Sequence, residues 1–111
     1  MFSDYYQVNK NYALRKINYR DAKEITVLKK ANRKYLEFLE WSKTQEYTIE
    51  ETFNYIGSKL LNWQYHREWT YEMLKNDKII GDFQIRPTKN PYALELGYWI
   101  DYKHREQGIL V

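Results

Sequence analysis

Two features in the last fifth of the chain carry residue types that could do chemistry. Glu95 stands inside the mostly apolar segment Tyr92–Ile100. A carboxyl group in partly apolar surroundings can have a raised pKa and can accept a proton from a substrate. Further along, Arg105 and Gly108 form an Arg-x-x-Gly sequence, by itself a weak signal for an anion-binding loop. Each feature also has a plainer interpretation, Glu95 as an exposed strand residue and residues 105–110 as a polar tail.

Several other chemistries find no support in the 111 residues. The chain has no cysteine, which excludes disulfide scaffolds, Cys-ligated zinc and thiol nucleophiles. His66 and His104 are too isolated to suggest a metal site, so we expect none. No apolar run approaches the roughly 20 residues that span a bilayer, and the first residues lack the apolar core of a signal peptide. We therefore expect a cytoplasmic protein that makes no membrane contact.

The charge is spread unevenly along the chain. The formal net charge is +3, whereas residues 15–34 hold eight basic and two acidic residues, a local net charge of +6. Solvated helix faces are the ordinary explanation of such a segment, and a small basic RNA-binding protein is the alternative. The twelve Tyr, four Trp and four Phe suit a core and its rim better than a surface for stacking bases. We therefore do not expect a nucleic-acid partner.

The first half of the chain has the spacing of one strand and two helical segments. Tyr12–Ile17 alternates as a short strand, and the residues before it look loosely held. Apolar residues at helical spacing predict one bent helix or two short ones over residues 20–40. Thr48 and Glu51 match a capping box, which predicts a second helix from Thr48 to about residue 62.

The second half of the chain changes to the alternation that is typical of strands. We expect strands at Trp69–Leu74, Ile79–Ile85 and Tyr92–Ile100, with a turn over residues 75–78 because Asn and Asp tolerate left-handed backbone.

The resulting order predicts an α/β (α+β) chain with two helical segments packed on a mostly antiparallel sheet of about four strands. Strict alternation in the middle strand predicts that Ile79, Phe83 and Ile85 share one face. The length fits a single domain over residues 1–111.

Four segments of this order resemble the GCN5-related N-acetyltransferase superfamily, and more narrowly its ribosomal-protein (RimJ/RimL-like) group. Leu14–Ala22 resembles the group's first strand and the entry to its first helix, and residues 32–41 resemble the join between the first two helices. The strand pair that ends in Ile79–Ile85 resembles the central hairpin. The most specific segment is Leu94–Gly108, LELGYWIDYKHREQG, which resembles the fourth strand and the start of the acetyl-coenzyme A loop. The resemblance covers about 100 of the 111 residues.

The loop departs from the family pattern at two positions, and the chain ends early. Glu106 stands where a glycine is common, and Leu110 stands where a small residue is common. Val111 is the last residue, at the place where the family's phosphate-binding helix begins. The resemblance therefore implies the N-terminal part of the acyl-CoA N-acyltransferase fold, truncated at the acetyl-coenzyme A loop.

The resemblance also implies a set of site residues and acetyl-coenzyme A as co-substrate, with no metal. Glu95 would be the general base that takes a proton from the amine, directly or through water. Tyr98 would donate a proton to the leaving thiolate, although a packed tyrosine is the alternative. The residues implied in cofactor binding are Trp99, Ile100, Asp101, Arg105, Glu106, Gln107, Gly108, Ile109 and Leu110.

The function that these features favour is transfer of acetyl from acetyl-coenzyme A to an amine. A protein N-terminus is the first acceptor to consider, and a small amine such as a polyamine or an antibiotic is the second. The alternatives are a non-catalytic remnant or interaction module of the same fold, and the RNA-binding protein described above. Because the apolar segment Tyr92–Ile100 would end a truncated sheet, we expect a homo-oligomer through this segment, or a chain that is part of a longer protein, in place of an active monomer.

Overall fold

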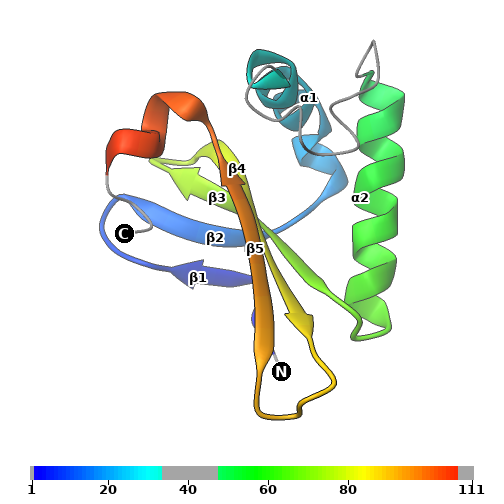
Figure 1. Ribbon diagram of the computed structural model, residues 1–111. Coiled ribbons are helices and arrows are strands. Elements are labelled where there is room, and N and C mark those ends of the chain that lie inside the picture. Colours follow the sequence, from blue (N-terminus) through cyan, green and yellow to red (C-terminus); the bar gives the residue numbers. More distant parts are fainter. Residues whose placement is uncertain (1, 34–47, 108–111) are drawn as a thin grey trace.

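The computed structural model of the protein describes residues 2–33 and 48–107, with side chains up to His104. An antiparallel sheet of five strands, in the order β1-β2-β3-β4-β5, packs against two helices that lie on the same side of it (Figure 1). The predicted fold class, helical segments on a mostly antiparallel sheet, is confirmed. In chain order the elements are β1 (Tyr5–Gln7), β2 (Tyr12–Lys16), η1 (Tyr19–Asp21), α1 (Ala22–Ala31), α2 (Ile49–Gln64), β3 (Trp69–Lys75), β4 (Lys78–Pro87), β5 (Leu94–Ile100) and η4 (Tyr102–Gln107).

Polar side chains cap free backbone N–H groups at the start of η1 and of α2. Asn18 accepts a hydrogen bond from the N–H of Arg20 at the start of η1, which leads directly into α1. Thr48 accepts one from the N–H of Glu51 at 3.2 Å, as the capping-box pattern predicts. The predicted helix over residues 48–62 is therefore confirmed, and α1 occupies the first part of the predicted 20–40 region, whose residues 34–40 lie outside the described residues.

Removing the α2 cap should cost a modest, measurable amount of stability. We expect Thr48→Ala to lower the free energy of unfolding by about 1 kcal/mol, because the Glu51 N–H loses its acceptor at a helix end. Urea denaturation followed by circular dichroism would measure the change. Thr48→Ser keeps the hydroxyl and should stay close to the wild type, and equal losses in the two variants would argue against a capping role.

The two faces of the sheet are built differently. The face toward the helices carries an apolar core at the β2 end of the sheet, and the opposite face packs large side chains around Tyr71 and Met73. The helices α1 and α2 close the first core from one side (Figure 1). Its buried members are Ala13, Ile17, Ala22, Ile25, Ile56, Leu74 and Ile79.

One predicted face assignment in β4 is wrong. Ile79 packs in the helix-facing core, whereas Phe83 and Ile85 pack with Tyr71 on the opposite side of the sheet. The three residues therefore do not share a face.

A β-bulge explains this difference. Met73 lies opposite Gly81 and Leu74 lies opposite Ile79, so Ile80 is an extra residue in β4 and the register shifts at this point. An extra residue reverses the facing of everything beyond it, so strict alternation fails across a bulge.

The residues expected to be loosely held before Tyr12 instead form a fifth strand. Residues of β1 pair with β2, with Tyr6 opposite Leu14. The Tyr71 hydroxyl donates a hydrogen bond to the Ser3 carbonyl at 2.6 Å, which holds the start of the chain to the sheet. All three β1 residues are exposed, so the strand has no buried side to reveal it in the sequence.

The other end of the sheet is the β4–β5 hairpin. β5 runs antiparallel to β4 and is the last strand in the sheet order. Leu94, Leu96 and Tyr98 are 54%, 59% and 59% exposed, while Trp99 and Ile100 at the end of the strand are buried. The apolar side chains of the strand are therefore buried only at its end, next to η4.

Candidate functional site

A polar pocket of about 370 Å³ lies between α2 and the helix-facing side of the β4–β5 hairpin. It opens where the sheet extends beyond the apolar core, so polar side chains line it. The β4–β5 register places Asp82 opposite Trp99 and Gln84 opposite Gly97. Gly97 leaves room for the Arg86 side chain in this wall of the pocket, because a Cβ there would lie 3.0 Å from a guanidinium nitrogen of Arg86. The lining comprises Tyr55 and Lys59 from α2, Asp82, Gln84 and Arg86 from β4, and residues 97–99 of β5.

Two buried carboxyl groups lie side by side at this pocket. Glu72 and Asp82 face each other across the β3–β4 ladder and are 0% and 1% exposed. The Tyr55 hydroxyl donates a hydrogen bond to Asp82 Oδ2 at 2.8 Å, and Gln84 Nε2 donates one to the Tyr55 hydroxyl at 3.1 Å. Within the described part of the chain, Asp82 Oδ1 and both Glu72 oxygens receive no hydrogen bond from a donor.

A single proton shared by Glu72 and Asp82 lets one carboxyl group donate a hydrogen bond to the other. Two ionised carboxylates can only accept, so neither can satisfy the other. Burial raises the pKa of Glu72 well above its usual range, and the neighbouring Asp82 charge raises it further, although Lys29 acts in the other direction. Glu72 therefore keeps its proton to a higher pH than an exposed glutamate does, and in that state it can donate to Asp82.

Tyr55 stays a hydrogen-bond donor in the same cluster. Burial raises the pKa of its phenol well above the usual value, and the Asp82 charge adds to the rise. The Lys29 ammonium lies 3.6 Å from the centroid of the Tyr55 ring, in a cation–π contact that comes from α1. The tyrosine thus links the acidic pair to both helices.

An ion-pair network borders the pocket toward the β4–β5 loop. Glu68 accepts hydrogen bonds from Lys59 Nζ at 2.7 Å and from the Arg86 guanidinium at 3.1 Å. Arg86 also donates to Glu95 Oε1 at 2.9 Å. Burial alone would raise the pKa of Glu68, but the bonds from Lys59 and Arg86 outweigh it and hold that pKa below its usual range. The two cations of the pocket wall are therefore already matched by two carboxylates.

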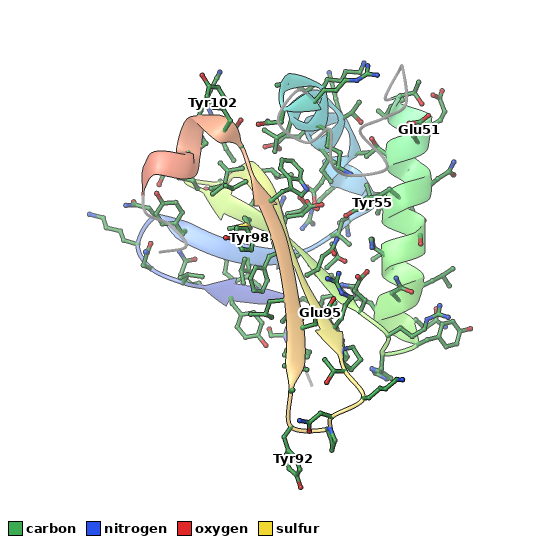
Figure 2. All side chains as sticks on the ribbon, in the orientation of Figure 1. Glu51, Tyr55, Tyr92, Glu95, Tyr98 and Tyr102 are labelled. Carbon is green, nitrogen blue, oxygen red and sulfur yellow. The ribbon has the colours of Figure 1, made fainter. Side chains whose placement is uncertain are left out.

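The two residues predicted for catalysis lie on opposite sides of β5. Glu95 is on the helix-facing side, largely exposed and paired with Arg86. Tyr98 lies opposite Phe83 in the register, which places it on the other side of the sheet, as Figure 2 shows. The structure does not bring the two side chains together, and only Tyr98 contributes to the pocket edge.

The residues predicted for cofactor binding form the end of β5 and the turn that follows it. Trp99, Ile100 and Asp101 are buried. Asn32, just after α1, clamps this turn, because its Nδ2 donates to Asp101 Oδ1 at 2.9 Å and its Oδ1 accepts from the Tyr102 N–H at 2.9 Å. Arg105, Glu106 and Gln107 belong to η4, and Gly108, Ile109 and Leu110 lie outside the described residues.

The sequence reasoning missed Tyr55, Glu68, Glu72, Asp82 and Arg86. The available signal was an acidic residue at the centre of each of two apolar strands, in WTYEML and IIGDFQI. The turn at Asn76 and Asp77, both with positive φ, brings those two strands into one hairpin.

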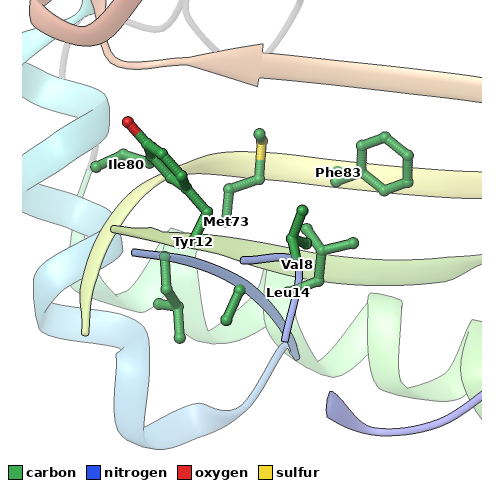
Figure 3. A pocket seen from close by; sticks show the side chains of 8 residues that line it. Val8, Tyr12, Leu14, Met73, Ile80 and Phe83 are labelled. Atoms are coloured by element: carbon green, nitrogen blue, oxygen red, sulfur yellow. The ribbon is translucent and has the colours of Figure 1, made fainter. Parts of the chain in front are cut away.

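Other regions of the molecule offer less chemistry. A pocket of about 90 Å³ on the opposite face of the sheet is lined by apolar side chains and the Tyr12 ring, and it presents no charge to a ligand (Figure 3). Among residues 2–33 and 48–107, no group of three or more His, Cys, Asp or Glu residues could hold a metal ion. Over the same ranges, no helix is long and apolar enough to cross a membrane.

Comparison with known proteins identifies one family. Residues 12–111 match the family described as an acetyltransferase (GNAT) domain. A search of curated proteins finds no match.

Solved structures share the fold at low sequence identity. RimL, the ribosomal L7/L12 alpha-N-protein acetyltransferase, in complex with coenzyme A, superposes with a TM-score of 0.83 at 22% identity, over 93% of this chain and 59% of that one. The microcin C7 self-immunity acetyltransferase MccE, in complex with acetyl-CoA and AMP, gives 0.83 at 18% identity, over 92% of this chain and 57% of that one. The ribosomal-protein-S5-alanine acetyltransferase from Vibrio fischeri gives 0.78 at 21% identity, over 96% and 61%. The chain thus spans about three fifths of the length of these three proteins.

Proposed function

The chain belongs to the acetyltransferase (GNAT) family, and on that premise we propose that it transfers an acetyl group from acetyl-coenzyme A to an amine. The observation that carries the proposal is the family match over residues 12–111, which includes the whole sheet from β2 to β5. A protein N-terminal amine is the acceptor that we favour, because RimL and the Vibrio fischeri protein are named as acetyltransferases of ribosomal proteins. A small amine is the second candidate.

The free edge of β5 suits the co-substrate. Within the described residues, β5 pairs with β4 and has no strand on its other side, so β5 forms an edge of the sheet. The pantetheine arm of coenzyme A carries amide groups, which can pair with such an edge much as another strand would. We assign this contact to residues 98–101, and the pyrophosphate contact to the backbone of residues 105–110.

The reaction follows from the chemistry of a thioester and an amine. The amine must first lose a proton, because only its free lone pair can attack the thioester carbonyl. We assign this proton to Glu95, directly or through water, since its carboxylate is exposed on the helix-facing side of β5. The amine nitrogen then bonds to the carbonyl carbon and releases its extra proton to solvent as the C–S bond breaks. The coenzyme A thiolate leaves and takes up a proton, which we assign to the Tyr98 hydroxyl, and the phenolate regains a proton from solvent.

The exposed apolar side of β5 supports the accompanying proposal of a homo-oligomer. Leu94, Leu96 and Tyr98 are exposed along β5 at the sheet edge, and Tyr92 is exposed in the loop just before it. Exposed edges with apolar side chains favour pairing with a second chain. Light scattering on the purified chain would test this, and a uniform monomer would contradict it.

Calorimetric titration of the chain with acetyl-coenzyme A tests the enzyme proposal against its alternatives. We expect saturable binding, followed by a mass gain of one acetyl group on a peptide with a free N-terminus. Binding without transfer to any amine would favour a non-catalytic module. Salt-sensitive binding of RNA in place of acetyl-coenzyme A would favour the basic-segment alternative.

If Glu95 is the general base, its substitution should lower kcat without changing the affinity for acetyl-coenzyme A. In a form of the chain that turns over, Glu95→Gln should lower kcat roughly 100-fold while acetyl-coenzyme A affinity stays within about twofold, because proton removal is felt in the transition state. The amide can still accept from Arg86, so the fold should be kept. Glu50→Gln, which removes an exposed carboxylate at the start of α2, is the matched control. Unchanged turnover at saturating substrates would assign Glu95 a structural role only.

A further inference from the structure

The polar pocket between α2 and the β4–β5 hairpin presents one carboxylate that has remaining capacity to bind a ligand. Asp82 is buried, lines the pocket, and uses only Oδ2 to accept from Tyr55. A carboxylate offers about four lone-pair sites, so even with Glu72 donating to it, Asp82 can accept further hydrogen bonds. Burying such a group without a full set of donors is costly, which points to a donor that arrives from outside.

The charges around the pocket define what that donor can be. Lys59 and Arg86, the cations of the wall, are matched by Glu68 and Glu95. They therefore leave little positive charge for an anionic ligand. Asp82 adds a negative charge to the lining itself, whereas Lys29, the further cation beside the acid pair, contacts the Tyr55 ring and is not part of the lining. A ligand that complements the lining therefore brings N–H donors to Asp82, and a positive charge on those donors suits its carboxylate.

The shape of the pocket agrees with a small cationic group. Gly97 forms the β5 side of the wall, and any larger residue there would push against Arg86. The volume of about 370 Å³ holds the end of a peptide or a small amine and is far smaller than a protein surface contact.

We propose that this pocket binds the primary ammonium group of the acceptor, through charge-assisted hydrogen bonds to Asp82, with Tyr55 and Glu72 holding that carboxylate in place. This inference rests on the proposed function, since it names the binding site of the acceptor amine. Asp82 acts here as a binding residue. Its position opposite Trp99 in the register puts the amine next to the end of β5, along which we assigned the pantetheine arm. Glu95 lies four residues away along the same strand, so from this site the proton reaches Glu95 through water.

The test uses the full chain and a defined probe, the tripeptide amide Ser-Ala-Gly-NH2, with its N-acetylated form as the uncharged control. Backbone and indole NMR signals follow the titration without acetyl-coenzyme A. We expect saturable shifts centred on Gly97 and Trp99 for the free amine only. Asp82→Asn should weaken this binding at least tenfold, because a charge-assisted hydrogen bond becomes a neutral one. Glu50→Gln should leave it unchanged.

A second variant keeps the test decisive if Asp82→Asn proves unstable. Gly97→Val retains every charge of the pocket and suits a strand, but its side chain occupies the space beside Arg86. We expect it to weaken binding of the free amine as well. Equal binding of the acetylated peptide, shifts elsewhere on the chain, no shift up to the solubility limit of the peptide, or wild-type affinity in both variants would overturn the inference.

The amine site and the proposed enzyme activity can be refuted separately. Asp82-dependent binding of the amine by a chain that neither binds nor uses acetyl-coenzyme A would keep the amine site and refute the proposed enzyme. Acetyl transfer that survives Asp82→Asn with an unchanged KM for the peptide would keep the enzyme and refute the amine site.

Discussion

Gly81→Ala should destabilise the protein by about 3 kcal/mol or more, among the largest effects of any single methyl group in the chain. Gly81 lies in β4 directly after the bulge, opposite Ile100 of β5. A Cβ at this position would lie 2.1 Å from the Trp99 carbonyl oxygen and 2.9 Å from the Ile100 Cα. Both are backbone atoms, so the clash can be relieved only by moving the two strands apart. Chemical denaturation of the variant would measure the loss.

Gly57→Ala is the matched control for this prediction. Gly57 lies in α2, and a Cβ there would meet the side chain of Tyr19, with its hydroxyl oxygen nearest at 2.8 Å. This is the end of an exposed side chain that can move away. Because alanine suits a helix interior better than glycine, this variant should be neutral or up to about 1 kcal/mol more stable. Similar losses at Gly81 and Gly57 would show that close approach to β5 is not the reason for the glycine in β4.

The position of Gly81 also matters for the candidate site. If β4 and β5 separate there, the neighbouring residue Asp82 loses its place opposite Trp99. We therefore expect Gly81→Ala to disturb the pocket as well as the stability, with a loss of the Tyr55–Asp82 hydrogen bond. The glycine thus supports the pocket from the backbone, without a side chain of its own.

Local patterns in the sequence predicted the elements well, because each signal depends on near neighbours. The Thr48–Glu51 pair marked the start of α2, and the Asn76–Asp77 pair marked the turn between β3 and β4. Such signals need only the backbone chemistry of a few adjacent residues. The strand β1 was not predicted, because its side chains are exposed and its main support is its pairing with β2.

The site could not be predicted in the same way, because it depends on register and on contacts distant in sequence. Glu72 and Asp82 are neighbours only because the β3–β4 hairpin contains a bulge at Ile80, a feature with no clear local signal. Tyr55 joins them from α2, 27 residues before Asp82 in the chain. Glu95 stood out in the sequence for its apolar neighbours, yet it lies on the exposed part of β5 and its partner is Arg86. Apolar neighbours in the sequence therefore did not mean that the Glu95 carboxyl group is buried.

The buried acid pair affects stability as well as binding, and the effect has a definite sign. The pKa of Glu72 is raised by burial, and then by Asp82, above its usual value of 4.5. In the unfolded chain the glutamate ionises near that usual value, whereas in the folded chain it keeps its proton. The contribution of Glu72 to the free energy of unfolding is therefore fully present below its pKa in the unfolded chain, and it is lost as the pH rises toward its pKa in the folded chain. The loss is about 1.4 kcal/mol for each pH unit in which only the unfolded state is ionised.

Glu72→Gln should remove this part of the pH dependence. The amide has the shape of the protonated acid and can still donate to Asp82, but it does not titrate. In urea denaturation from about pH 5 to about pH 8, we expect the free energy of unfolding of the variant to rise relative to that of the wild type, by up to about 1.4 kcal/mol for each pH unit. Asp21, whose pKa burial also raises against the opposing charges of Arg15 and Arg20, is present in both proteins, and its charge is one of the smaller causes of the raised Glu72 pKa. Glu50→Gln, an exposed substitution at the start of α2, should keep the wild-type slope. Parallel pH profiles for the wild type and Glu72→Gln would mean that Glu72 ionises alike in the folded and unfolded chains, and the pair at the pocket would then not hold a shared proton.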